Sequence, residues 1–143
     1  ERGAILVIDY GFPAREYFHP QRSMGTLACH YRHHVHHDPF YLPGLQDVTA
    51  HVDFSALARA ATDAGLEMLG FANQAQFLVN CGITDLLAAE NPAEAKRYLP
   101  AAAAAQKLLS PAEMGELFKV LVVGRGVKDA LMGFSRGDRR GTL

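Results

Sequence analysis

Side chains that donate, accept and carry charge are concentrated in the first third of the sequence. All seven histidines lie between His19 and His51, and four of the five tyrosines lie between Tyr10 and Tyr41. Imidazole titrates near neutral pH, so it can act as a proton donor, a proton acceptor or a metal ligand. We therefore expect the functional site to be built from this part of the chain.

Carboxylates occupy the same region and indicate a second kind of chemistry. Paired carboxylates can orient a guanidinium or ammonium group through bidentate hydrogen bonds, or can act as general acid and base. Asp53 precedes a helical pattern, so helix capping is its expected role. Asp9 and Glu16 follow a predicted buried strand and are the better candidates for function. The carboxylates of the region are Asp9, Glu16, Asp38, Asp47 and Asp53.

The histidine cluster also has the chemistry of a metal site. Histidine and carboxylate are common ligands of zinc and other transition metals. However, the spacing is unlike the helical HExxH arrangement, and five clustered histidines contain almost any short motif by accident. We predict no metal, and keep a metal-binding protein as an alternative. The cluster consists of His30, His33, His34, His36, His37 and Asp38.

A strand is expected immediately before Asp9. Residues 4–8 form a continuous apolar run with three β-branched residues, bounded by glycines and too short for a stable helix. This pattern predicts a strand that is buried on both faces of a parallel sheet. Ligands of open α/β sheets bind beyond the carboxyl ends of the strands, so Asp9 and Tyr10 would lie at the site. Gly11 would let the chain turn away sharply.

Helical and strand patterns alternate in the rest of the chain, which predicts an α/β fold. Asp53 should cap a helix that Gly65 ends, and residues 66–71 should form a strand that lies parallel to another strand of the same sheet. We expect residues 135–143 to be a frayed tail. Further strands are expected at residues 25–31, 48–52, 118–123 and 131–134, and further helices are expected to begin near Asn73, Thr84, Asn91 and Ser110, with an alanine-rich helix at residues 101–109.

Composition favours one globular domain that comprises residues 1–143. The chain has 143 residues and is 49% hydrophobic, which is enough for a packed core. A net charge of −1 gives no electrostatic footprint for nucleic acid, and no apolar run reaches the length of a membrane span. Cys29 and Cys81 lack the spacing of a disulfide framework, which favours a reducing, cytoplasmic compartment. Because Glu1 leads directly into a strand that needs neighbours, we expect the chain to be the C-terminal part of a larger protein.

Two kinds of catalytic motif are missing from the sequence. Gly124-Arg-Gly126 follows a predicted strand, but no helix or third glycine completes a dinucleotide-binding turn. Neither cysteine and no serine lies in a GxSxG nucleophile motif. The sequence therefore leaves the residues that would bind a cofactor unknown.

An ordered series of short motifs resembles one known family. The motifs are Ile8-Asp-Tyr-Gly11, Glu16-Tyr-Phe-His-Pro20, Gly25-Thr-Leu27, His30-Tyr-Arg-His33, Asp38-Pro39, Pro43-Gly44 and Gln46-Asp-Val-Thr-Ala-His-Val-Asp-Phe54. Together they resemble the MidA family of S-adenosylmethionine-dependent methyltransferases. That family includes a mitochondrial complex I assembly factor to which methylation of a complex I arginine is attributed. The later segments Gly70-Phe, Gln74-Ala, Phe77-Leu and Phe118-Lys-Val are similar too, so the resemblance covers most of the chain.

The resemblance implies the last strands of a Rossmann-like methyltransferase sheet, with a His/Tyr-rich insertion and added helices. Residues 4–8 and 66–71 would be the fifth and sixth strands, and residues 118–123 would be the antiparallel seventh. The glycine-rich loop that binds most of the S-adenosylmethionine would belong to an N-terminal half that this chain lacks. The chain would supply the wall of the active site on which a protein arginine rests, and would be inactive alone.

The resemblance and the carboxylate chemistry together give the candidate site residues. Methyl transfer needs a nucleophile aligned with the sulfonium methyl, so positioning is the main contribution. The carboxylates would orient a guanidinium, and the aromatic and imidazole groups would shape the pocket. The expected catalytic residues are Asp9, Glu16 and Asp47, and the expected substrate-binding residues are Tyr10, Tyr17, His33, Gln46 and His51.

Partners follow from the same expectations. The substrate would be a protein, such as a subunit of a respiratory complex I, in a bacterial cytoplasm. The open edge of the sheet would pair with the missing N-terminal half or with a second copy of the chain. Neither nucleic acid nor a membrane is expected. The alternative is a non-catalytic module that binds a partner protein through the His/Tyr-rich loop or through the helices around residues 101–109.

Overall fold

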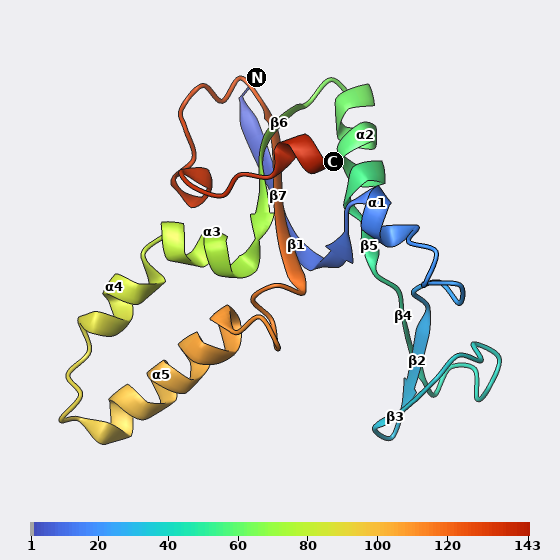
Figure 1. The fold of residues 1–143 in the computed structure, drawn as a ribbon, viewed down its shortest axis with the longest axis horizontal. Helices are drawn as coiled ribbons and strands as arrows, with labels where there is room; N and C mark the ends of the chain where they lie inside the picture. The colour runs from blue at the N-terminus through green and yellow to red at the C-terminus, as the bar shows by residue number, and fades with distance from the viewer. Residues whose placement is uncertain (1) are drawn as a thin grey trace.

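The computed structural model describes residues 2–143 and shows two β-sheets with helices around them (Figure 1). The strands are β1 (Gly3–Phe12), β2 (Ala28–Tyr31), β3 (His34–His36), β4 (Asp47–Thr49), β5 (Val52–Asp53), β6 (Glu67–Asn73) and β7 (Phe118–Arg125). The larger sheet has the strand order β5-β1-β7-β6, and the smaller sheet has the order β3-β2-β4. The predicted combination of helices and strands in one α/β fold is confirmed.

The helices lie around the larger sheet and extend from it. In Figure 1, α3, α4 and α5 form an arm that leads away from the larger sheet, and the smaller sheet projects in another direction. The helices are α1 (Ala14–Tyr17), α2 (Phe54–Asp63), α3 (Gln74–Asn80), α4 (Ile83–Ala88) and α5 (Ala95–Leu109), with the 3-10 turns η1 (Met132–Phe134) and η2 (Arg140–Thr142).

The core lies on both faces of β7. Leu121 and Val123 pack on one face with residues of α2 and β6, and Val120 and Val122 pack on the other face with Phe134 of η1. Alternate residues of a strand point to opposite faces, so one β-branched strand serves both clusters. Each large apolar side chain buried in this way stabilises the fold by about 1.5–3 kcal/mol.

Three elements that follow the smaller sheet, α2, α3 and β6, lie where local sequence signals predict them. The carboxylate of Asp53 accepts a hydrogen bond from the Ala56 amide at 3.0 Å and caps α2, and Gly65 takes a φ of 75° just after the helix. Asn73 caps α3 by accepting from the Gln76 amide at 2.9 Å. The predicted strand at residues 66–71 is β6, and it runs parallel in direction to β1 because both are antiparallel to β7.

The prediction that residues 4–8 are buried on both faces of a parallel sheet is wrong for the residues that the structure describes. β1 pairs with β7 in antiparallel orientation along most of its length and has a parallel partner, β5, only at Gly11 and Phe12. Ile5, Leu6 and Ile8 are 55%, 51% and 45% exposed. The apolar run indicates a strand that can be buried. Among residues 2–143, however, β5 is the only strand that pairs with the outer edge of β1.

The C-terminal segment is ordered against β6, so the expected frayed tail is wrong. The Arg139 amide donates to the Phe71 carbonyl at 2.7 Å, and the Phe71 amide donates to the Asp138 carboxylate at 3.3 Å. The Arg140 guanidinium donates to the Met68 carbonyl at 2.8 Å. The expected strand at residues 131–134 is instead the turn η1, whose Phe134 ring fills the space beside Gly70.

Two predicted helix starts are also wrong. Asn91 accepts from the Ala93 amide at 3.1 Å within a turn, and α5 begins only at Ala95. Ser110 ends α5, and a turn follows in which the Gly115 amide donates to the Ser110 carbonyl at 2.8 Å. Asn-Pro and Ser-Pro pairs close turns as readily as they start helices, because the side chain or carbonyl bonds the local backbone in either case.

The strand expected at residues 48–52 is divided between the two sheets. β4 pairs with β2, where Thr49 lies opposite Ala28, and β5 pairs with β1, where Val52 lies opposite Gly11. His51 therefore lies at the junction of the sheets. Gly11 does not provide a sharp turn: it lies within β1, where a Cβ atom would collide with the Val52 backbone, so it permits the close approach of β5.

Candidate functional site

Aromatic side chains meet at the carboxyl end of β1. The Tyr10 ring lies edge-on to His51 at a centroid distance of 5.3 Å and to Phe118 at 5.6 Å. The Phe12 ring contacts the other side of His51 at 5.1 Å, and the Arg22 guanidinium lies 3.8 Å from the Phe12 centroid. The end of the strand thus carries a wall of packed rings with one imidazole at its centre.

His51 is held with one ring nitrogen free. Its amide donates to the Thr26 hydroxyl at 3.2 Å, and that hydroxyl donates to the Tyr17 hydroxyl at 3.4 Å. The Nδ1 atom of His51 is buried without a hydrogen-bond partner. Burial, and then the Arg22 charge, lower the pKa of His51, and the nearby Thr26 backbone and the Asp9 charge act against that effect. The neutral imidazole is favoured, and it can accept or donate one proton at Nδ1.

A buried lysine that the sequence-based predictions did not include, Lys119, follows Phe118 in β7. Lys119 is only 4% exposed and stands opposite Asp9 in the β1–β7 ladder. Its ammonium donates to the Glu116 carbonyl and lies 3.6 Å from the Glu116 carboxylate. Burial lowers the pKa of Lys119, and the Glu116 and Glu16 carboxylates act against that effect. The sequence signal is a lysine inside an otherwise apolar strand pattern.

The structure gathers some of the predicted site residues at this end of β1. Asp9 accepts a hydrogen bond from the Tyr10 amide at 2.8 Å, and His51 touches Tyr10. Tyr17 joins them through Thr26, as described above. Glu16 lies in α1 and is near enough to Lys119 to influence its charge.

The other predicted residues belong to the smaller sheet. His33 is exposed in the turn between β2 and β3, and Asp47 is exposed on β4 opposite His30. Gln46 donates to the Pro39 carbonyl at 2.7 Å. The described contacts do not join these three side chains to the carboxyl end of β1, so their roles remain predictions.

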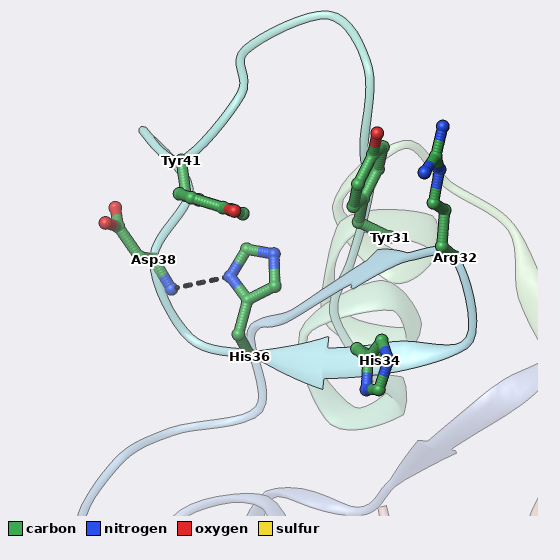
Figure 2. A pocket seen from close by; sticks show the side chains of 6 residues that line it. All are labelled: Tyr31, Arg32, His34, His36, Asp38 and Tyr41. Carbon is green, nitrogen blue, oxygen red and sulfur yellow. Dashed lines mark hydrogen bonds between the residues drawn. The ribbon is translucent and has the colours of Figure 1, made fainter.

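The smaller sheet carries an open pocket of its own, with a volume of about 570 Å³. Figure 2 shows Tyr31 and Tyr41 on opposite sides of the gap, with the His36 ring between them. The rings of His36 and Tyr41 meet edge-on at 5.3 Å. The pocket is lined by Tyr31, Arg32, His34, His36, Asp38 and Tyr41.

Neither a group of metal ligands nor a membrane-spanning helix is present among residues 2–143. Across residues 2–143, no three side chains of histidine, cysteine, aspartate or glutamate come close enough together to hold a metal ion. Within that range there is also no helix whose length and apolar character would let it cross a bilayer.

Sequence and structure comparisons identify the family to which the chain belongs. A sequence model of the family described as "Putative S-adenosyl-L-methionine-dependent methyltransferase" matches residues 1–72, and the chain belongs to this family. Among its relatives are proteins named "Protein arginine methyltransferase NDUFAF7, mitochondrial". The zebrafish (Danio rerio) protein is 34% identical over 85% of this chain, and the mouse (Mus musculus) protein is 37% identical over 81%.

Two solved structures are similar over nearly the whole chain. A Burkholderia thailandensis protein crystallised with S-adenosyl-homocysteine is 60% identical over 99% of this chain, with a TM-score of 0.94. A native structure of a protein from the same organism has 60% identity and a TM-score of 0.96. This chain covers 36% and 38% of those chains, and 27% and 25% of the zebrafish and mouse proteins. It thus spans about a quarter to two fifths of the proteins that it matches.

Two glycines near strand ends, Gly11 and Gly124, do not form a cradle for S-adenosylmethionine. A cofactor cradle needs glycines at the end of a strand whose missing side chains leave room for the ligand. A Cβ atom on Gly11 would meet the Val52 backbone, and one on Gly124 would meet Gly3 and Leu69. The chain itself occupies the space that these two glycines free.

Proposed function

We propose that this chain is the C-terminal part of an S-adenosylmethionine-dependent methyltransferase that modifies protein arginine, and that it forms the substrate side of the active site. The observation that carries the proposal is the convergence of Asp9, Tyr10 and His51 at the carboxyl end of β1, in a chain 60% identical to a protein crystallised with S-adenosyl-homocysteine. The relatives named as protein arginine methyltransferases support the choice of acceptor. A respiratory complex I subunit is the acceptor that the family resemblance suggests.

The strand order supports the assignment of β1, β6 and β7 to the end of a methyltransferase sheet. β7 lies between β1 and β6 and is antiparallel to both. We assign β1 and β6 as the fifth and sixth strands and β7 as the inserted seventh. The smaller sheet lies between β1 and β5 in the chain and would be the His/Tyr-rich insertion.

The cofactor supplies an electrophilic methyl group when it is bound, and in our proposal residues outside this chain hold most of it. The residues of this chain act on the acceptor. The Asp9 and Glu16 carboxylates would bind the guanidinium by charge-assisted hydrogen bonds and fix its orientation. The neutral His51 would accept a guanidinium N–H at Nδ1, and the Tyr10 ring would bound the space beside it.

Replacing Asp9 by Asn tests the proposal in the full methyltransferase. The amide has nearly the shape of the carboxylate, so stability and cofactor affinity should stay close to those of the wild type. The loss of the negative charge should lower arginine methylation by about 100-fold or more, since hydrogen bonds to charged groups contribute 1.5–3 kcal/mol each and the charge also sets the orientation. Methylation of an arginine peptide, measured with labelled S-adenosylmethionine, gives the rate.

Asp63→Asn is the matched control, because Asp63 is an exposed carboxylate at the end of α2, remote in the chain from Asp9. It should methylate at the wild-type rate. If Asp9→Asn also keeps the wild-type rate, Asp9 only shapes the turn after β1 and the proposed role is wrong.

A further inference from the structure

The pocket of the smaller sheet has an unused hydrogen-bond donor. The Asp38 amide donates to Nδ1 of His36 at 3.3 Å, drawn as the dashed line in Figure 2. A neutral imidazole that accepts at Nδ1 carries its proton at Nε2, so Nε2 is a donor. The Nε2 atom of His36 is buried and has no hydrogen-bond partner. Figure 2 shows this nitrogen on the side of the ring that faces Tyr31, away from Asp38.

The charge next to this donor is positive. The Arg32 guanidinium lies 5.4 Å from the centroid of the Tyr31 ring and borders the same pocket. The carboxylate of Asp38 does not balance it within the gap. That carboxylate accepts from the Phe40 amide at 2.9 Å, and in Figure 2 it points away from the space between the two tyrosines. The polar groups that remain available to a ligand are thus mainly donors.

The backbone that positions these groups includes three residues other than glycine with positive φ. Arg32 and His33, the two residues of the β2–β3 turn, have φ values of 45° and 67°, and Leu42 in the loop next to Tyr41 has a φ of 51°. Glycine or asparagine usually occupies such positions, and other residues there cost of order 1–3 kcal/mol each when the conformation is sparsely populated. Two successive residues with positive φ form the favoured turn of a two-residue β-hairpin, and this turn fixes the backbone that carries Arg32.

We propose that this pocket binds the carboxylate of an acidic side chain in the protein substrate, at a second site separate from the arginine site. The Arg32 guanidinium and the His36 Nε2–H would donate to the carboxylate, and the Tyr31 and Tyr41 rings would enclose the aliphatic part of the side chain. A volume of about 570 Å³ is within the usual range for ligand pockets. The identity of the ligand as a protein substrate rests on the proposed function, whereas the carboxylate site rests on the pocket itself.

Binding can be measured without methylation. In the full methyltransferase with 15N-labelled histidine, the ring signals of His36 report the pocket directly. The probes are the blocked peptides acetyl-Gly-Glu-Gly-amide and acetyl-Gly-Gln-Gly-amide, which differ by one charge. We expect the Glu peptide to shift the His36 signals and to bind about tenfold or more tightly than the Gln peptide, because the Gln peptide loses the charge-assisted bonds.

Two variants and one control connect this binding to the pocket. Arg32→Asn removes the charge but tolerates the left-handed backbone, and His36→Phe keeps a ring but removes the donor. Each variant should bind the Glu peptide about tenfold more weakly than the wild type and should bind the Gln peptide with nearly the same affinity. Because His36→Phe lacks the ring that reports binding, its affinity is measured by calorimetry. Arg59→Gln removes an exposed charge on α2 and should leave both affinities unchanged.

Three results would overturn the inference: equal affinity for the two peptides, full retention of Glu-peptide binding by Arg32→Asn and His36→Phe, or acetate binding as tightly as the Glu peptide. The last would show a site for free carboxylates rather than for a peptide. A different result would contradict the proposed function and leave the carboxylate site intact. If no arginine is methylated but the Glu peptide binds as described, the carboxylate site stands and the reaction assigned above is wrong.

Discussion

The two outer edges of the larger sheet differ in how they are finished. At the β6 edge the chain returns on itself, and Arg139, Arg140 and Asp138 bond the strand through backbone and side-chain groups. At the β1 edge, β5 covers only the last two residues, Gly11 and Phe12. Beyond them a row of backbone groups and three large apolar side chains remain open among the residues that the structure describes.

The difference shows which edge of the sheet is covered by residues of this chain. A finished edge has charged or bonded groups that prevent another strand from pairing with it, as the C-terminal segment does for β6. An unfinished edge with exposed Ile5, Leu6 and Ile8 is a surface that a further strand would cover. The relatives, which are about three to four times as long as the stretch that matches this chain, have additional chain available for that role.

The largest expected effect concerns the open edge. Residues 1–143 expressed alone should not behave as a monomer, because the edge of β1 pairs with another copy or aggregates. In the full methyltransferase, the amides of residues 3–10 should be protected from hydrogen exchange. Sedimentation and exchange mass spectrometry measure the two states. A stable monomer of the short chain with protected β1 amides would show that the edge needs no partner.

The β6 edge should depend instead on packing inside the chain. Phe134 is 8% exposed and its ring lies 5.3 Å from the Phe77 ring, so Phe134→Ala should lower the free energy of unfolding by about 3–5 kcal/mol. The neighbouring Met132 is 67% exposed, and Met132→Ala should change stability by less than about 0.5 kcal/mol. Denaturant titration of the full protein compares them. Equal effects would mean that η1 does not anchor the C-terminal segment.

Sequence patterns predicted the parts of the fold that depend on local signals. Asp53 and Asn73 cap the helices they precede, and the apolar, β-branched run of β7 forms the central strand. The exposure of β1 could not be predicted in the same way, because an apolar run indicates that a strand can be buried and does not identify what covers it. The C-terminal segment was missed since its contacts with β6 are made by charged side chains in a polar stretch.

In the candidate site, too, residues marked by local sequence signals were predicted and residues defined by contacts in the folded chain were not. Asp9 and Tyr10 were predicted because they follow a strand, and position at a strand end is readable from sequence. Lys119 was not predicted, because a single lysine within a strand pattern usually faces solvent, whereas here its ammonium is buried and donates to the Glu116 carbonyl in the turn before β7. The unpaired Nε2 of His36 depends on one backbone hydrogen bond in a loop, which no residue pattern reports.

The smallest expected effect concerns His51. This residue lies between β4 and β5, where β5 covers the last two residues of the β1 edge. Burial lowers the pKa of His51 below its ordinary value of 6.5, so near and below that pH the folded protein binds fewer protons at this residue than the unfolded chain does. The free energy of unfolding should therefore fall as the pH is lowered from 6.5 to the pKa that His51 has in the folded protein. Above pH 6.5, His51 should make the free energy of unfolding no more dependent on pH. His51→Gln should reduce the fall, and His34→Gln, at an exposed histidine of β3, should leave it unchanged. Unfolding titrations between about pH 5 and 8 measure how the free energy of unfolding depends on pH. If His51→Gln leaves that dependence unchanged, the His51 ring is hydrated, and β5 leaves this end of the β1 edge as open as the rest.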